Sequence, residues 1–216
     1  MRWLPWIGDN FSKSKGKLLV LGESNYKWKG EEDAWEIVNL KRFERDLIKQ
    51  RYITKELKEN KIKIFENIIK TVYNKNDISS VEKKCFFNAI SYCVIVQRPF
   101  KNRAIRPNNN DFLDGWRVIS KIIQIIKPKN ILFLGTAAIN YLLNDPNILL
   151  PLSLCHYKVN KNKINNTYPR RFILKNNDCD INCIGIRHAS SYYTWKSWNG
   201  YIKKYINLNE IINKDV

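Results

Sequence analysis

The sequence predicts an α/β fold: a three-layer α/β/α sandwich with a central, mostly parallel four-stranded sheet. Short apolar segments with the character of strands begin near residues 17, 85, 130 and 181. Longer segments with apolar residues at helical spacing separate them. Because strands that alternate with helices pair in parallel rather than as hairpins, helices are expected on both faces of the sheet.

The first strand is predicted at residues 17–22, where an apolar run of leucine and valine ends at Gly22. A short polar turn over residues 23–26 follows it. The residues before this strand are irregular and rich in aromatic side chains. We expect Trp3 and Trp6 to pack onto the body of the protein rather than to bind a base.

Two helices are predicted next, at residues 31–51 and 55–73. Both carry apolar side chains at roughly helical spacing and charged side chains on their other faces. The apolar positions are Trp35, Val38, Phe43 and Leu47 in the first helix and Leu57, Ile64, Ile68 and Val72 in the second. The polar residues 74–80 are expected to form a loop and not a domain boundary, because neither side of it has a self-sufficient core.

The second apolar segment spans residues 85–96, and at least part of it is predicted to be a strand. Asn88 interrupts this apolar run. A buried amide must find hydrogen-bond partners or cost free energy. Asn88 therefore either satisfies nearby backbone groups or presents its amide to a ligand, and the sequence leaves both interpretations open.

A basic loop is predicted at residues 97–110, because the prolines and asparagines there prevent a helix from persisting. It holds four cations: Arg98, Lys101, Arg103 and Arg106. Such cations suit contact with backbone phosphates, which are bound by charge without regard to sequence. A helix over residues 111–127 follows, with Asn110 or Asp111 as its N-cap and Pro128 after its end.

A further buried strand is predicted at residues 130–135, and it leads into a helix over residues 136–143. Residues 144–171 are expected to be a basic, irregular loop.

The last strand, at residues 181–186, is expected to deliver Arg187 and His188 to its carboxyl end. A polar run follows it, and a helix over residues 194–208 closes the fold.

Length and charge limit the classes of function. A chain of 216 residues is expected to form one domain over residues 1–216. Its 38 Lys and Arg residues outnumber 20 Asp and Glu residues, which gives a formal net charge of +18. The excess is concentrated in residues 83–130 and 151–216. Such a charge predicts a polyanionic partner, with nucleic acid favoured over an anionic membrane surface.

The sequence shows no signal peptide and no apolar run near the roughly 20 residues that a membrane span needs. Its five cysteines have no CxxC spacing. A metal shared by Cys179 and Cys183 is one alternative, with His156 and His188 the only histidines to assist. Thiols that stay reduced in the cytoplasm are the favoured interpretation.

Three polar residues are expected to meet at one edge of the sheet. Glu23 and His188 follow the ends of separate predicted strands, and Asn88 lies within or at the end of another. Because the carboxyl ends of parallel strands lie at the same edge of a sheet, a carboxylate, an imidazole and an amide would lie together at that edge.

These residues carry a resemblance to the uracil-DNA glycosylase superfamily, which has a three-layer fold around a four-stranded parallel sheet. The family's first motif has forms such as GQDPY and GEAPG, and this chain has GESNY at residues 22–26. Its last motif is a His-Pro-Ser type loop, and this chain has HASS at residues 188–191. The family places an asparagine at a strand end between the two motifs, matched here by Asn88. The two motifs and the segment between them cover about 170 residues.

The resemblance implies roles at the base. Glu23 would stabilise the oxocarbenium-like sugar and orient the attacking water, and His188 would donate a hydrogen bond to the departing base. Asn88 would read the Watson–Crick edge. Tyr26 would form a wall against the 5-position of a pyrimidine, with Gly22 and Ser24 also in the base-binding set.

The resemblance also implies DNA contacts. Residues expected to hold phosphates or to lie against DNA are Ser190, Ser191, Arg98, Arg103 and Arg187. DNA is thus the expected partner, the protein is expected to be a monomer, and no membrane contact is expected.

The chain departs from the family pattern in three ways. The carboxylate lies at the second position of the first motif, as in GEAPG, and not at the third. Both motif prolines are replaced, by Asn25 and Ala189. The cysteine set that holds an iron–sulfur cluster in one branch has no counterpart, so we predict neither a cluster nor another cofactor. The aromatic that stacks on the base is unassigned, with Trp28 and Phe87 as candidates.

The expected activity is that of a monofunctional DNA glycosylase, which flips a nucleotide and leaves an abasic site. The excised base is either uracil, as in repair, or a hypermodified pyrimidine, such as a glucosylated hydroxymethylcytosine in phage DNA. A non-catalytic DNA-binding relative is a further alternative, and a small-molecule enzyme is the least favoured because it leaves the charge of +18 unexplained.

Overall fold

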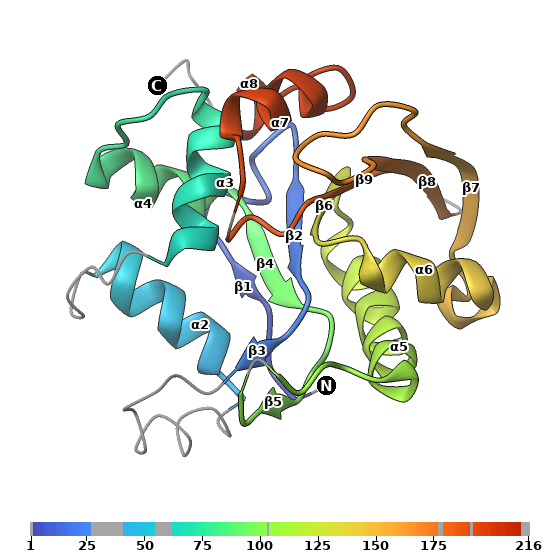
Figure 1. The fold of residues 1–216 in the computed structure, drawn as a ribbon. Helices are drawn as coiled ribbons and strands as arrows, with labels where there is room; N and C mark the ends of the chain where they lie inside the picture. The colour runs from blue at the N-terminus through green and yellow to red at the C-terminus, as the bar shows by residue number, and fades with distance from the viewer. Residues whose placement is uncertain are drawn as a thin grey trace.

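The computed structural model describes residues 2–26, 41–54, 62–102, 104–176, 179–190 and 192–212. These residues form an α/β structure with a mixed sheet of seven strands in the order β1-β4-β2-β6-β9-β8-β7 (Figure 1). The strands are β1 (Trp6–Ile7), β2 (Leu18–Gly22), β4 (Ser91–Val94), β6 (Asn130–Leu134), β7 (Ser153–Val159), β8 (Arg170–Asn176) and β9 (Cys179–Ile186).

The middle of the sheet is parallel and its edges are antiparallel. Strands β4, β2, β6 and β9 pair in parallel, whereas β1 joins one edge and β8 and β7 join the other edge in antiparallel register. The predicted strands at residues 17–22, 130–135 and 181–186 are confirmed. The prediction of a four-stranded sheet is wrong, because the sheet is larger and mixed.

The predicted loop at residues 144–171 is also wrong, since β7 and the start of β8 lie within it. β7 is an edge strand with exposed or half-buried residues throughout, and a β-bulge interrupts its register between Cys155 and Lys158. Leu154, just before this bulge, and Tyr157, within it, are half-buried against a hydrophobic cluster of the core. The bulge breaks the two-residue alternation of apolar and polar side chains by which a strand is predicted.

The helices are α2 (Phe43–Ile48), α3 (Lys63–Tyr73), α4 (Ser80–Ala89), α5 (Asn109–Ile126), α6 (Ala137–Asn144), α7 (Trp195–Ile202) and α8 (Asn209–Ile212). A π-helical turn (Lys49–Ile53) extends α2, a 3-10 turn (Pro146–Leu149) follows α6, and β3 (Asn25–Tyr26) pairs with β5 (Pro99–Phe100) in a small parallel sheet.

The predicted helices at residues 111–127 and 136–143 are confirmed, and the one at 194–208 is shorter than expected. The N-cap of α5 is Asn108, in a capping box with Asp111, rather than Asn110 or Asp111. Of the two predicted N-terminal helices, Phe43, Leu47, Ile64, Ile68 and Val72 lie in α2 and α3. Trp28, Trp35, Val38 and Leu57 lie outside the described residues.

Asn88 lies in α4, and its predicted placement in or at the end of a strand is wrong. Ser79 starts α4 with a capping box. Its side chain accepts a hydrogen bond from the Glu82 backbone amide, and its own backbone amide donates to the Glu82 carboxylate. The helix continues through Phe86 and Phe87, which are buried, so that β4 begins only at Ser91. Asn88 therefore precedes its strand and lies at the amino edge of the parallel sheet.

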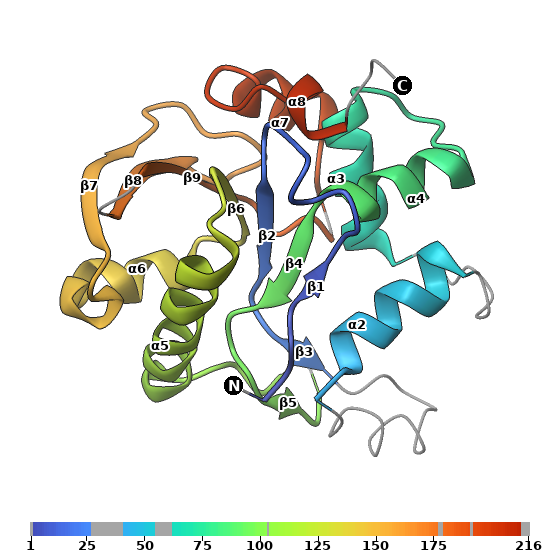
Figure 2. The same cartoon turned by 180° about the vertical axis from the view of Figure 1, so that it is seen from behind.

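Helices cover both faces of the sheet, as Figures 1 and 2 show from opposite sides. Alternate residues of β2 enter two separate hydrophobic clusters. Leu18 and Val20 pack with side chains of α2, α3, α4, α7 and α8, and Leu19 and Leu21 pack with those of α5 and α6. As expected, Trp3 and Trp6 are buried, in the first of these clusters.

Candidate active site

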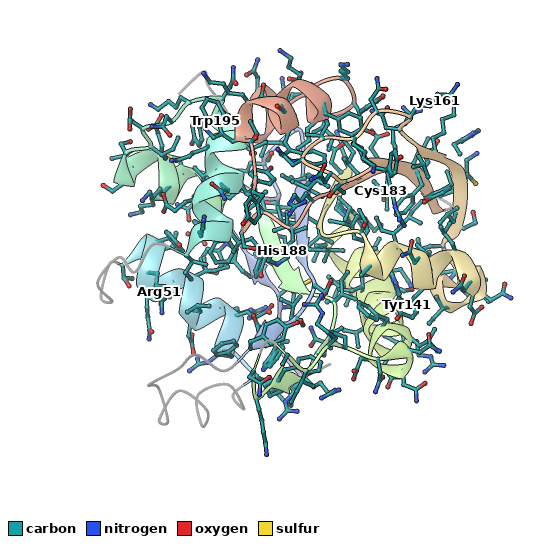
Figure 3. The ribbon with its side chains drawn as sticks, viewed as in Figure 1. Arg51, Tyr141, Lys161, Cys183, His188 and Trp195 are labelled. Carbon is teal, nitrogen blue, oxygen red and sulfur yellow. The ribbon has the colours of Figure 1, made fainter. Side chains whose placement is uncertain are left out.

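A cavity of about 310 Å³ opens at the carboxyl edge of the parallel strands. It receives residues that follow β2, β6 and β9, together with one from the loop between β7 and β8. The lining residues are Glu23, Gly135, Thr136, Ala137, Thr167, Arg187, His188 and Ser190. In Figure 3, His188 lies near the middle of the view, between Arg51 on one side and Tyr141 on the other. The predicted meeting of Glu23 with His188 is thus confirmed.

Close packing at the end of β2 positions Glu23. A Cβ atom on Gly22 would lie 2.7 Å from the Tyr92 hydroxyl and 3.1 Å from a Val94 methyl, so a larger residue does not fit there. The backbone carbonyls of Gly22 and Glu23 accept hydrogen bonds of 2.9 Å from the amides of Ile95 and Val96. Glu23 therefore leaves the sheet from a fixed backbone.

The Glu23 carboxylate is largely buried and has a cationic partner. Its side chain is 12% exposed, and Arg106 Nη2 donates a hydrogen bond of 2.7 Å to its Oε1. Arg106 Nη1 also donates to the Tyr26 hydroxyl at 3.1 Å. Burial raises the pKa of Glu23 above its ordinary value, and the positive charge of Arg106 opposes that rise. The carboxyl group is thus suited to exchange a proton nearer neutrality than an exposed carboxyl.

The connection between β6 and α6 forms the floor of the cavity. Gly135 has a φ of 119°, a conformation that side chains rarely adopt, and its amide donates to the Ile186 carbonyl at 3.0 Å. Thr136 and Ala137 then start α6 beside the cavity, and Thr136 makes no capping hydrogen bond with its side chain. The amides of a helix N-terminus favour negative charge, so this side of the cavity suits an anionic group.

His188 is held by the loop that carries it. Its Nδ1 shares a hydrogen bond of 2.8 Å with the Ser190 hydroxyl, and Ala189 between them is fully buried. Asn67 of α3 donates to the Ala189 carbonyl at 2.6 Å. With Ser190 as the donor, Nε2 is the nitrogen that carries the imidazole proton.

One asparagine joins this loop to the β7–β8 connection. The Asn165 carbonyl accepts a hydrogen bond of 2.5 Å from Arg187 Nη1, and its side chain bonds both the amide and the hydroxyl of Thr194 at 2.9 and 2.8 Å. Thr167, two residues on, lines the cavity. The sequence pattern marks neither Asn165 nor Thr167, because their segment was expected to be an irregular loop.

Asn88 is not brought to the site. It lies at the opposite edge of the parallel strands, where its backbone carbonyl accepts from Asn10 and its Oδ1 is buried with no hydrogen-bond partner among the described residues. Phe87, a candidate for stacking on a base, is fully buried in the core. Gly22, Ser24 and Tyr26 are absent from the cavity lining, although Gly22 and Ser24 adjoin Glu23 in the chain.

The predicted phosphate contacts have mixed placements. Arg187 and Ser190 line the cavity. Arg98 instead forms a two-pronged ion pair with Asp111, at 2.5 and 2.7 Å, and covers the Phe100 ring at 4.1 Å. The hydrogen bond from Arg98 lowers the pKa of Asp111, so the pair stays charged and Arg98 is committed to the N-terminus of α5. Arg103 and Ser191 lie outside the described residues.

Two features of the site were not predicted. Tyr192 is 85% exposed, with a φ of 51°, directly after the His188 loop. Glu44 of α2 is 1% exposed, and Asn25 Nδ2 donates to its Oε1 at 3.2 Å. No sequence pattern marked Glu44, because it lies among the charged residues of a helix that was expected to have a solvated face. Tyr192 was detectable as an aromatic in a polar run beside the last motif.

Within the ranges that the structure describes, no helix is both long and apolar enough to cross a membrane, and no group of three or more His, Cys, Asp or Glu side chains is arranged to hold a metal ion. Comparison with protein-family models and with curated proteins found no match to this chain.

Proposed function

We propose that the protein is a DNA glycosylase, which hydrolyses the N-glycosidic bond of a flipped-out base and leaves an abasic site. One observation carries the proposal: Glu23 and His188, from strands far apart in the sequence, line the same cavity. The helices on both faces of the sheet also agree with the three-layer fold of the family that GESNY and HASS resemble. The net charge of +18 supports DNA as the partner.

The two side chains suit the two charges that develop when the bond breaks. The sugar becomes positive, and the ionised Glu23 carboxylate stabilises it and orients a water for attack. The base leaves as an anion, and His188 donates a hydrogen bond to its oxygen. The backbone amides at the start of α6, beside Thr136 and Ala137, add donors on the same wall.

Base recognition falls to groups other than Asn88, which lies at the far edge of the strands. Thr136 and Thr167 line the cavity, and a threonine hydroxyl can act as both donor and acceptor. Because a threonine hydroxyl can rotate, it can hydrogen-bond to base edges with different patterns of donors and acceptors. This is compatible with either uracil or a modified pyrimidine as the substrate.

The test uses end-labelled duplexes that carry a single uracil, hypoxanthine or glucosylated 5-hydroxymethylcytosine. Each is incubated with the protein and then heated in alkali, which cuts at abasic sites. Cleavage at one of these bases supports the proposal and names the substrate. Retained DNA binding with no abasic product on any duplex would favour a non-catalytic DNA-binding protein.

The pH dependence of base release is expected to show the effect of the Arg106 charge on the Glu23 carboxyl group. The acid limb of the kcat/KM profile follows proton loss from Glu23 in the free enzyme. Because Arg106 opposes the rise in the Glu23 pKa, Arg106→Gln is expected to move that limb to higher pH. Arg117→Gln is the matched control, since Arg117 is 63% exposed against 64% for Arg106 and pairs with Asp114. Superimposable profiles for all three proteins would exclude this role.

Tyr192 is expected to fill the gap that a flipped nucleotide leaves in the duplex. Aromatic stacking on bases is worth roughly 5- to 150-fold in affinity, so Tyr192→Ala is expected to lower kcat/KM on duplex DNA by about that factor. Tyr192→Phe should restore most of it. The loss should be smaller on single-stranded DNA, where no stack must open. Ile125→Ala is the control, because Ile125 is 76% exposed on α5.

A further inference from the structure

The hairpin arm is defined as β7, β8 and the loop of residues 160–169 between them. It carries positive charges and has no acidic residue of its own to neutralise them. Residues 153–176 contain six cations and no Asp or Glu. These cations are Lys158, Lys161, Lys163, Arg170, Arg171 and Lys175. In the figures the arm lies on the side of the molecule opposite α4 (Figures 1 and 2).

Three lysines of the arm are available to a partner. Lys158, Lys161 and Lys163 are exposed, and no carboxylate of the described residues forms a salt bridge with them. Figure 3 shows Lys161 at the outer rim of the molecule. Because no described carboxylate pairs with them, these charges add nothing to folding through ion pairs, and they remain able to release counterions on binding a polyanion.

An exposed aromatic lies among these charges. Tyr168 is 45% exposed, and the Lys163 ammonium lies 4.9 Å from its ring centroid. Tyr168 follows Thr167, which lines the cavity. An aromatic ring beside cations is the arrangement by which proteins hold single-stranded nucleic acid, through base stacking and phosphate contact together.

The tip of the arm has a defined shape. Ile164 and Thr167 exchange backbone hydrogen bonds of 2.9 and 3.0 Å around Asn165 and Asn166. Both asparagines have positive φ, 47° and 59°, as a two-residue hairpin turn with right-handed twist requires. Asn165 in turn is bonded to Arg187 and Thr194. The arm is therefore anchored beside the His188 loop.

We propose that the hairpin arm is a nucleic-acid-binding surface that holds the DNA strand flanking the nucleotide in the cavity. Lys158, Lys161 and Lys163 contact its phosphates, and Tyr168 stacks on an unpaired base next to the target. The inference rests on the proposed function for the identity of the partner. Protection of an exposed sheet edge by lysine explains Lys158 on β7, but not Lys161, Lys163 or Tyr168, which lie beyond the strand.

The first experiment measures the salt dependence of DNA binding. The variant Lys158→Ala/Lys161→Ala/Lys163→Ala is compared with Lys13→Ala/Lys15→Ala/Lys84→Ala, whose three lysines are exposed outside the arm. The dissociation constant for a labelled, unmodified duplex is measured across NaCl concentrations. The slope of log Kd against log[salt] should fall by roughly two to three in the arm variant, at about 0.9 for each lost phosphate contact. An equal fall in both variants would overturn the proposal.

A second comparison isolates Tyr168. Tyr168→Ala is expected to weaken binding to single-stranded DNA by roughly 5- to 150-fold, while Tyr168→Phe binds as the wild type does. Equal affinities for all three proteins would remove stacking from the proposal. Thermal melting of every variant checks that the fold is intact.

These measurements separate the arm from the proposed activity, because binding to unmodified DNA requires no base release. DNA binding that depends on the arm, without any abasic product, would support the arm and remove the glycosylase. Base release at the wild-type rate in the arm variants would support the glycosylase and remove the arm. Sedimentation with phosphatidylserine vesicles in preference to DNA, lost in the arm variant, would assign the surface to membranes and overturn the proposal.

Discussion

Replacing Glu23 with glutamine is expected to slow base release by about 10²- to 10⁴-fold, the usual contribution of a positioned acid–base group. Glutamine keeps the shape of the side chain and its hydrogen-bonding reach, but it carries no negative charge to stabilise the sugar cation. DNA binding should persist, since the variant removes a carboxylate from a basic surface. Single-turnover assays on the duplex that the wild type cleaves give the rate, and fluorescence anisotropy gives the affinity.

Asp114→Asn is the matched control for this variant. It removes one negative charge from an exposed position on α5, where Asp114 pairs with Arg117. Its rate should equal that of the wild type. If Glu23→Gln also released the base at the wild-type rate, the reacting carboxylate would have to lie elsewhere and the proposed mechanism would be wrong.

Glu44→Gln is expected to change how the stability of the protein depends on pH. Burial raises the pKa of Glu44 to about 8, although hydrogen bonds from Asn25 and from the Val94 backbone favour the ionised form. Tyr92 and Cys93 also interact with it, and neither supplies a positive charge. Glu44 is therefore protonated in the folded protein at neutral pH.

The sign of the effect follows from proton uptake. Between pH 4.5, the ordinary pKa of the carboxyl, and about 8, the folded protein holds a proton on Glu44 that the unfolded chain has lost. The free energy of unfolding should thus fall as pH rises through this window, by up to about 1.4 kcal/mol per pH unit from this group. The favourable contribution is complete below the lower pH and lost above the higher one.

Urea unfolding at a series of pH values measures this slope. The curve for Glu44→Gln should be flatter than that of the wild type by the amount that Glu44 contributes, because glutamine does not ionise. Asp114→Asn should keep the wild-type slope. Parallel curves for wild type and Glu44→Gln would show that Glu44 does not hold its proton in the folded state.

The sequence was most informative where a strand is buried on both faces. Strands β2 and β6 are almost wholly apolar, and β9 ends in the apolar residues 183–186. The residues that follow these strands are placed by the topology of the sheet, so the sequence could predict that Glu23 and His188 lie close together. Asn88 was misplaced because the buried phenylalanines of α4 resemble a strand, although the Ser79–Glu82 capping box was visible in the sequence.

Other features depend on contacts that local pattern does not contain. The pairing of Arg98 with Asp111 joins a loop to a helix start, and the burial of Glu44 depends on Asn25 and β4. The first strand of the hairpin arm was missed because a β-bulge interrupts its alternation and its residues are only half-buried or exposed. Its Asn165–Asn166 turn was the one local sign that the chain reverses there.

The hydrogen bonds of Asn165 determine whether the entropy cost of ordering the His188 segment is incurred during folding or during ligand binding. Arg187 and Thr194, which flank the His188 segment, both bond to this one asparagine, and Tyr193 bonds Thr71 of α3 at 2.9 Å. Both ends of the segment are thereby fixed, and the freedom of those residues is given up when the chain folds. A ligand that enters the cavity then meets an imidazole already in place, and little of its binding free energy is consumed in ordering the protein.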